Sequence, residues 1–312
     1  MFIRAQFVAL LIAAACVAGS EPNTTPDLTA SPRSSPRAAV EWAREMNFVG
    51  AGDIAWCSNN GDEATAKLLD TLPGTVFTAG DNAYQEGTAS QFANCYGPTW
   101  GRHKVRTRPS PGNHDYARSG ASAYYAYFGS RAGPAGRGYY SYEVGSWHVI
   151  SLNSNVSMAN GSAQHTWLKN DLAASGAFCT LAYWHHPLFA SGTQVGGSTA
   201  SKPLWNLLFA GGADVIVAGH EHNYERFAPQ TPAGRANATY GIREFMVGTG
   251  GKSLSGAVRS PRLPNSQAFN GTTWGVLALR LGEGGYRWTF VPVGGKTFTD
   301  AGSTACHGKP GS

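Results

Sequence analysis

The stretch VIVAGHEHNYER, residues 215–226, decides how this 312-residue chain is interpreted. Its first five residues are apolar or glycine, and the run ends at His220, with a second imidazole two positions later at His222. A continuous apolar run of this length is typical of a strand that is buried on both faces, as in a parallel sheet. The stretch therefore predicts a buried strand whose carboxyl end carries two potential metal ligands.

Three earlier segments repeat this pattern of an apolar run followed by a polar residue. Residues 48–52 precede Asp53, residues 76–80 precede Asp81, and residues 181–184 precede His185. We interpret each segment as a buried strand whose carboxyl end carries the chemistry. The candidate metal ligands at or near these ends are Asp53, Asp81, Tyr84, Asn113, His185, His220 and His222.

Five short motifs contain these residues in order: GD at 52–53, GDNAY at 80–84, GNHD at 112–115, HHP at 185–187 and GHEH at 219–222. Together they resemble the motifs of the calcineurin-like metallophosphoesterases and, within that superfamily, of the purple acid phosphatases. Phosphoesterases of the general type have a His two positions after the first Asp. This chain has Ala55 there, where purple acid phosphatases usually have Gly, and it has Tyr84 three positions after the second Asp. The resemblance extends from about residue 48 into the 280s.

The fold that this resemblance implies is an α/β four-layer αββα sandwich, with two central mixed sheets flanked by helices. The apolar runs predict strands near 48–52, 76–80, 147–152, 179–184, 214–218 and 243–248. Helices are expected over 62–72, 164–173 and 202–209. Residues 274–290 are expected to form a hairpin that turns at 282–285, and the Ser-, Gly- and Pro-rich stretch 250–271 is expected to be a long surface loop near the site.

The resemblance also implies a dinuclear metal centre. Two metals about 3.5–4 Å apart can clamp a phosphate ester and lower the pKa of a bound water. The first metal would take Asp53, Asp81, Tyr84 and His222, and the second would take Asp81, Asn113, His185 and His220, so that Asp81 bridges the two ions. Phenolate and carboxylate oxygens favour Fe(III) at the first position, whereas imidazole and amide ligands suit Zn, Mn or Fe(II) at the second. A tyrosinate on ferric iron would colour the protein.

Three further residues are candidates for catalysis. We expect His114, next to Asn113, to donate a proton to the leaving alcohol, because hydrolysis needs a positioned acid. Asp115 would orient that imidazole. His186 either touches the phosphate or simply follows its neighbour in the sequence, since a His at a strand end is more often a buried polar group than a functional one.

The first 38 residues have the composition of a targeting segment and a tether. Residues 1–20 predict a secretory signal peptide, because Arg4 precedes an apolar run that is too short to span a bilayer. Residues 21–38 are rich in Pro, Ser and Thr and predict a disordered linker, so that a single catalytic domain would occupy 39–312. Cys16 follows small residues and is either a lipid-anchor site or lost with the signal peptide. No transmembrane span is expected, and the protein is expected to be secreted or extracytoplasmic.

Four cysteines remain in the expected domain: Cys57, Cys95, Cys179 and Cys306. An even number in an oxidising compartment predicts two disulfides, for which three pairings exist. Sequence locality favours pairing Cys57 with Cys95 and Cys179 with Cys306. Zinc binding by these thiols is disfavoured, because no close Cys-x-x-Cys spacing is present.

The net charge of +5 and the pI near 9.0 raise the question of an anionic partner. Arg102, Lys104, Arg106 and Arg108 lie just before the GNHD motif and are either a rim that attracts phosphate esters or a solvated basic face. No aromatic-interleaved basic repeat or nucleic-acid motif is visible, which argues against a nucleic-acid partner.

Three functions remain open at this point. The leading one is a secreted phosphatase that hydrolyses small phosphate monoesters by a metal-bound hydroxide, with a His as general acid. A phosphodiesterase or nuclease on the same site is the alternative, because pocket width, and not the metal pair, sets the number of ester bonds accepted. A catalytically silent binding protein is disfavoured, because no expected ligand is missing. The oligomeric state is left open.

Overall fold

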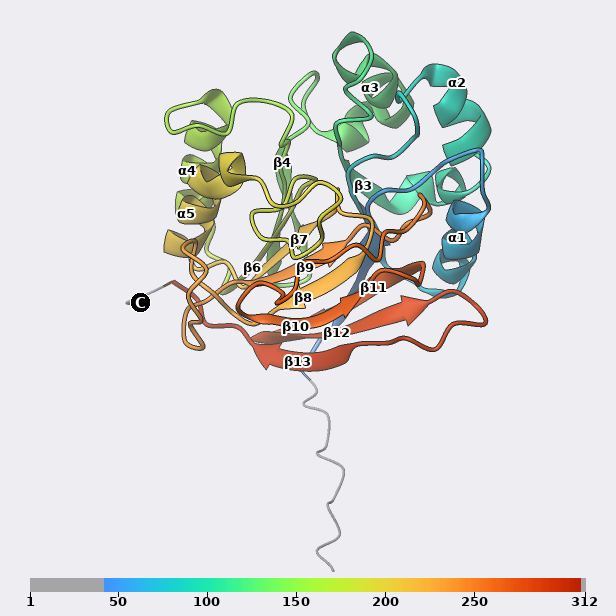
Figure 1. Cartoon of the computed structure of the whole chain (residues 1–312). Coiled ribbons are helices and arrows are strands. Elements are labelled where there is room, and N and C mark those ends of the chain that lie inside the picture. The colour runs from blue at the N-terminus through green and yellow to red at the C-terminus, as the bar shows by residue number, and fades with distance from the viewer. Residues whose placement is uncertain (1–41, 310–312) are drawn as a thin grey trace, which may run out of the picture. The chain divides into compact units, whose positions relative to one another are not determined.

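The computed structural model describes residues 42–309, which form two mixed β-sheets with helices outside them (Figure 1). In spatial order the first sheet contains β13 (Ala301–Ala305), β12 (Gly285–Pro292), β11 (Gly275–Gly282), β1 (Met46–Ala51), β2 (Thr75–Ala79) and β3 (Thr107–Ser110). The second contains β10 (Ser266–Asn270), β8 (Tyr224–Phe227), β9 (Arg243–Val247), β7 (Val215–Ala218), β6 (Cys179–Tyr183), β5 (Trp147–Ser151) and β4 (Tyr140–Val144). Strands β1, β2 and β3 run parallel, as do β5, β6, β7 and β9.

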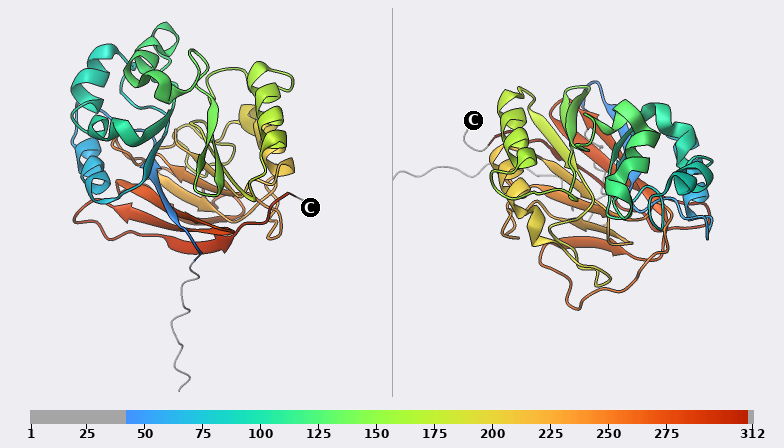
Figure 2. Two further views of the ribbon diagram at one scale, coloured as in Figure 1. Left: turned by 180° about the vertical axis from the view of Figure 1, so that it is seen from behind. Right: turned by 90° about the horizontal axis from the view of Figure 1, so that it is seen from above.

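Helices cover the outer faces of both sheets. The α-helices are α1 (Gly61–Thr71), α2 (Ala89–Gln91), α3 (Ser122–Phe128), α4 (Ala163–Ala174) and α5 (Lys202–Ala210). Short π- or 3₁₀-helical segments are η1 (Phe92–Tyr96), η2 (Trp100–Arg106), η3 (Ser119–Ala121), η4 (Gly129–Ala132) and η5 (Thr199–Ser201). Two further views show α4 and α5 side by side against the second sheet, with α1 on the opposite side (Figure 2). The expected αββα order of layers is confirmed.

The alternation of side chains along the central strands explains why the two sheets stack. Leu181 and Tyr183 on β6 join the core between the sheets, where Tyr183 packs against Phe48 and Phe77. The intervening Ala182 points to the other face and joins a second core that includes residues of α4 and α5. A strand that is apolar on both faces can be buried only between two layers.

The carboxyl ends of the parallel strands of both sheets meet at one place. The amide of Gly52, just after β1, donates a hydrogen bond to the carbonyl oxygen of Val247 at the end of β9, at 2.8 Å. The amide of Gly219, after β7, donates to the carbonyl oxygen of His185, after β6, at 3.1 Å. The loops that follow these strands are therefore brought together from the two sheets.

The six predicted strands and three predicted helices are all present, and the predicted hairpin is formed by β11 and β12. Five strands were not predicted: β3, β4, β8, β10 and β13. The expected loop 250–271 is only partly a loop, because its last residues form the edge strand β10. Polar or small residues dominate β10 (SQAFN) and β13 (AGSTA), so neither strand has an apolar pattern from which it could be predicted.

Both favoured disulfides are present. Cys57 is bonded to Cys95 and Cys179 to Cys306, with Cα atoms 5.1 and 5.6 Å apart. Between residues 42 and 309, no helix has the length and apolar character needed to cross a bilayer. The expected signal peptide (1–20), the expected linker (21–38) and Cys16 lie outside the described residues.

Candidate metal centre

Three candidate ligands occupy an unusual backbone conformation where their strands end. Asp53, Asp81 and His220 have positive φ angles of 59°, 50° and 76°. Residues with a side chain rarely adopt this left-handed region, and those that do are concentrated at functional sites. The amide of Asp53 donates to the carbonyl oxygen of Gly80 at 3.1 Å, and the amide of His220 donates to Oδ2 of Asp53 at 2.8 Å. The sharp turns thus aim the side chains of adjacent strands at a common point.

The four residues expected at the first metal form one cluster. The Tyr84 hydroxyl group lies 2.8 Å from Oδ1 of Asp53 and 2.9 Å from Oδ2 of Asp81. Nε2 of His222 lies 3.4 Å from the Tyr84 hydroxyl and 3.4 Å from Oδ1 of Asp53. All four side chains are buried. We call these residues the tyrosine cluster.

The four residues expected at the second metal form a second, adjoining cluster. Nε2 of His185 lies 3.2 Å from Oδ2 of Asp81, 3.0 Å from Oδ1 of Asn113 and 3.1 Å from Nδ1 of His220. We call these residues the histidine cluster. Oδ2 of Asp81 therefore lies between Tyr84 and His185, the position that a bridging carboxylate needs.

The charges within the two clusters are strongly coupled. Burial alone would raise the pKa of Asp81, but the charges of His185 and His114 outweigh it and lower the pKa well below its usual value. Burial likewise opposes the charged form of His185, yet Asp81 raises the pKa of His185 to about 9. Burial, reinforced by Asp53 and Asp81, raises the pKa of Tyr84 well above 10. The carboxylates thus attract positive charge and resist any further negative charge.

The donor atoms suit a pair of metal ions. Carboxylate, phenol and amide oxygens converge with three imidazole nitrogens, and the close-packed carboxylates are buried where a cation would offset their charge. Two groups of three residues have ligand-type atoms that all lie within 4.8 Å of one another. The first group is Asp53, Asp81 and His185, and the second is His185, His186 and His220. The second group adds His186, which the expected ligand set did not contain.

Glycines next to the candidate ligands allow the backbone to approach their carboxylates closely. A Cβ atom added to Gly112 would clash with Oδ1 of Asp81, and one added to Gly219 would lie 2.7 Å from Oδ2 of Asp53. The motifs GNHD and GHEH therefore need glycine because backbone and carboxylate approach closely. Glu221, in the second motif, accepts hydrogen bonds from the amides of Val195 and Gly196 and so fixes the loop beside His222.

Asp115 does not orient the His114 imidazole, contrary to expectation. Its carboxylate accepts hydrogen bonds from Gly112 at 2.8 Å and from both the amide and the side chain of Asn82. Adjacent side chains on this turn point in different directions. Instead Nδ1 of His114 lies 2.6 Å from the carbonyl oxygen of Gln85, and Nε2 lies 3.8 Å from Oδ2 of Asp81. The imidazole of His114 is therefore held by backbone and faces the bridging carboxylate.

The imidazole of His186 is held in place by a hydrogen bond between its Nδ1 and the Ser154 hydroxyl. Oγ of Ser154 lies 2.7 Å from Nδ1 of His186 and accepts a hydrogen bond from the amide of the same residue at 3.1 Å. The ring lies 4.3 Å from that of His220, centroid to centroid. Burial and the charge of His185 lower the pKa of His186 to about 3, so its imidazole is neutral near pH 7. Sequence reasoning missed Ser154, which belongs to no motif.

The four basic residues before the GNHD motif all make contacts within the fold. Arg102 pairs with Asp70 and Glu63 on α1, and Arg106 donates to the carbonyl oxygens of Gly74 and Leu69. The remaining two cations lie over aromatic rings, namely Lys104 over Tyr127 and Arg108 over Tyr142. Arg102 is therefore charge-compensated by two carboxylates, whereas the contacts of Lys104, Arg106 and Arg108 leave their positive charges in place.

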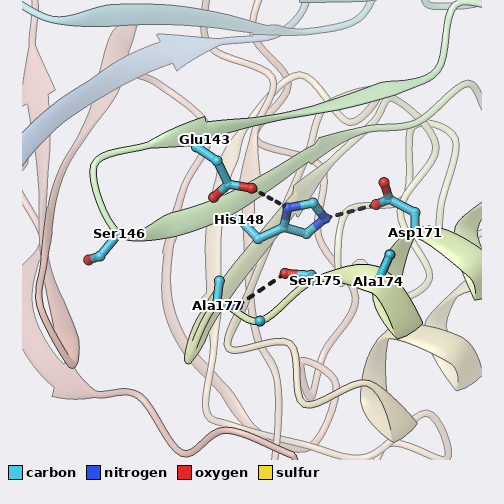
Figure 3. A pocket seen from close by; sticks show the side chains of 8 residues that line it. Glu143, Ser146, His148, Asp171, Ala174, Ser175 and Ala177 are labelled. Carbon is cyan, nitrogen blue, oxygen red and sulfur yellow. Dashed lines mark hydrogen bonds and ion pairs between the residues drawn. The ribbon is translucent and has the colours of Figure 1, made fainter.

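A separate pocket of about 460 Å³ lies beside α4, away from the two clusters (Figure 3). His148 lies on its wall, with Nδ1 2.8 Å from Oε1 of Glu143 and Nε2 2.8 Å from Oδ2 of Asp171. Burial alone would lower the pKa of His148, but the hydrogen bonds to Asp171 and Glu143 outweigh it and raise the pKa. Because the two carboxylates approach different ring nitrogens, this group is an ion-pair bridge and not a metal site.

Comparison with known proteins gives consistent results. A family model described as "Calcineurin-like phosphoesterase" matches residues 46–224. Purple acid phosphatase 15 of Arabidopsis thaliana is 26% identical over 211 residues, which cover 56% of this chain and 40% of that protein. Purple acid phosphatase 23 of the same plant is 29% identical over 222 residues, which cover 59% and 48%. The chain thus matches less than half the length of these curated relatives.

Solved structures show the same fold. Purple acid phosphatase PPD1 from yellow lupin (Lupinus luteus) superposes with a TM-score of 0.71 at 17% identity, covering 84% of this chain and 54% of that one. GAP50, described as the anchor in the inner membrane complex of Plasmodium, superposes with a TM-score of 0.66 at 16% identity, covering 85% and 90%. At these identities the likeness shows the fold alone.

Proposed function

Because this chain is a purple acid phosphatase-like member of the calcineurin-like phosphoesterase family, we propose that it is a secreted phosphatase that hydrolyses phosphate monoesters at a dinuclear metal centre. The observation that carries the proposal is the position of Asp81. One of its carboxylate oxygens lies 2.9 Å from the Tyr84 hydroxyl and 3.2 Å from Nε2 of His185. That oxygen lies between the two clusters of proposed ligands, where a carboxylate could be shared by two metals.

The tyrosine cluster would hold Fe(III), and the histidine cluster would hold Zn, Mn or Fe(II). Hard anionic oxygens dominate the first, and imidazole with a neutral amide oxygen dominates the second, which is the preference of a trivalent and a divalent ion respectively. When bound, the two metals would activate water and offset the charge of the phosphate. The protein supplies the geometry through the turns at Asp53, Asp81 and His220.

Two further imidazoles would act on the substrate. His114 would protonate the leaving oxygen, since its ring is held by the Gln85 carbonyl group and faces the bridging carboxylate. His186 would contact the phosphate, since Ser154 fixes its Nδ1 and leaves Nε2 available as a hydrogen-bonding atom. Asp115 has a positioning role in this scheme, because it holds the turn that carries Asn113 and His114.

Secretion is proposed on two grounds. The first 20 residues have the composition of a signal peptide. The two disulfides are the kind of crosslink that persists in an oxidising compartment. Small phosphate esters are the proposed substrates, because the chain belongs to the phosphoesterase family.

The test is a comparison of turnover of 4-nitrophenyl phosphate with that of bis(4-nitrophenyl) phosphate, together with metal analysis of the same preparation. We expect two metals per chain and preferential hydrolysis of the monoester. The variant Asp81→Asn serves as the matched control for contaminating phosphatases, because it alters one atom of the bridging group. Faster hydrolysis of the diester would favour the phosphodiesterase alternative. Two bound metals without turnover of either ester would favour a binding protein.

A further inference from the structure

Lys252 lies against the tyrosine cluster although it belongs to none of the five motifs. Its ammonium nitrogen is 4.7 Å from the centroid of the Tyr84 ring and 3.5 Å from that of the Trp56 ring. The same nitrogen donates a hydrogen bond to Oε1 of Gln85 at 2.9 Å. A cation within about 6 Å of an aromatic centroid is attracted to the electron density of the ring.

The backbone of Lys252 is fixed to the same site. Its amide donates to the carbonyl oxygen of Asp53 at 2.9 Å, and its own carbonyl oxygen accepts a hydrogen bond from the Trp274 indole at 2.8 Å. Only 8% of the residue is exposed. The position of this ammonium group is therefore set by the turn that also sets Asp53.

The surroundings of the ammonium explain why a charge is held there. Among residues 42–309 it makes no ion pair, so no neighbouring carboxylate neutralises it directly. Burial lowers the pKa of Lys252, whereas Asp81 and Asp53 oppose that change. The anionic donor set of the tyrosine cluster is thus the counter-charge of this lysine, at longer range and in a poorly solvated environment.

We propose that Lys252 is a positioning residue that holds the Tyr84 ring and offsets the negative charge of its phenolate when the first metal is bound. This inference rests on the proposed function for the identity of Tyr84 as a ligand. A positive charge near the phenolate stabilises the electrons that the oxygen shares with the metal. Transfer of an electron from the phenolate to Fe(III) then requires more energy than it would without the lysine.

The consequence can be measured without any assay of activity. In Lys252→Met the aliphatic chain keeps its place between the rings while the charge is lost, so the phenolate-to-iron absorption band should move to longer wavelength. In Lys252→Arg the charge is kept, and the band should stay near its wild-type position. A role limited to packing predicts the opposite, because methionine would preserve the band and the bulkier arginine would disturb it.

The experiment uses the full chain, stripped of metal and reconstituted with Fe(III), and records visible spectra of wild type and variants. Lys67→Met is the matched control, because Lys67 is an exposed residue of α1 that pairs with Glu63. A shift to longer wavelength in Lys252→Met, with Lys252→Arg and Lys67→Met unchanged, supports the proposal. An unshifted band in Lys252→Met overturns it, and so does a wild-type protein that binds Fe(III) without any such band.

Failure of this inference remains distinct from failure of the proposed function. Monoester turnover by the as-purified protein tests the function and does not depend on the position of the band. If the wild-type protein turns over monoesters but the band of Lys252→Met is unshifted, the role of Lys252 is contradicted and the phosphatase function stands. If the band of Lys252→Met is shifted but the wild-type protein turns over no monoester, the role of Lys252 stands and the phosphatase function is contradicted.

Discussion

The hydroxyl group of Tyr84 lies 2.8 Å from Oδ1 of Asp53, a residue 31 positions earlier in the chain. This contact joins the loop after β2 to the turn after β1, and it places a phenol between two buried carboxylates. Burial and both carboxylates raise the pKa of that phenol, so the metal-free site favours the protonated form. A bound Lewis-acidic ion would favour the ionised form of Tyr84.

Replacement of Tyr84 by Phe should bleach the protein and reduce its iron content. The ring would still occupy the space beside His114 and Lys252, but the oxygen that favours a trivalent ion would be gone. Visible spectra and iron per chain check this expectation. Tyr125→Phe is the control, because the hydroxyl of Tyr125 bonds to that of Tyr116, outside the two clusters. A coloured, iron-replete Tyr84→Phe protein would remove Tyr84 from the ligand set.

Asp81 and Asn113 should differ in how many metals they hold. Asp81→Asn removes a charged oxygen that is shared by both clusters, so we expect loss of both metals and of activity. The side-chain oxygen of Asn113 lies 3.0 Å from Nε2 of His185 in the histidine cluster, so Asn113→Ala should retain the first metal and weaken the second. Metal content by mass spectrometry distinguishes the two patterns. Equal losses in both variants would contradict the bridging assignment.

His114 should matter most when the leaving group is a poor one. A general acid contributes about 10²–10⁴-fold to rate, and an acidic phenol departs without its help. We therefore expect His114→Ala to retain its metals and to lose kcat/KM for an alkyl phosphate far more than for nitrophenyl phosphate. Equal losses for the two substrates would show that His114 only binds phosphate, and His186 would then be the next candidate for the acid.

His148 should make the stability of the fold depend on pH. Its pKa is raised above the unfolded value of 6.5, so its stabilising contribution is full below that pH and is lost as the pH rises through the higher folded-state pKa. In urea unfolding with the disulfides intact, His148→Gln should cost about 1–2 kcal/mol more near pH 6 than near pH 9. His165→Gln, on α4, should show no such difference, because His165 contacts no carboxylate among the described residues. A pH-independent cost for His148→Gln would exclude the charged bridge.

The apolar runs were sufficient to predict the central strands, because a strand buried on both faces must be apolar throughout. The strand β8 escaped prediction because its sequence, YERF, is polar yet buried. The side chain of Arg226 on this strand donates a hydrogen bond to the carboxylate of Asp300, 74 residues later, and the hydroxyl of Tyr224 donates to the same carboxylate. Such long-range compensation leaves no local signal in the sequence.

The candidate ligands given by motif order lie close together in the structure, but the residues that support them could not be anticipated. Sequence adjacency suggested that Asp115 orients His114, whereas the turn directs its carboxylate to Gly112 and Asn82. Lys252 and Ser154 reach the site through tertiary structure, from segments without any recognisable motif. Side-chain direction and distant contacts are properties of the folded chain, and a linear pattern does not contain them.

The division of the proposed ligands between the two sheets would make metal binding a check on correct assembly. Asp53, Asp81, Tyr84 and Asn113 follow strands of one sheet, and the three imidazole ligands follow strands of the other. Neither sheet alone offers all four proposed ligands of either ion, so tight metal uptake would require that the sheets have first packed in register. Because bound metal then favours the packed state by mass action, a chain with misaligned sheets would forgo that stabilisation and remain distinguishable by its metal content.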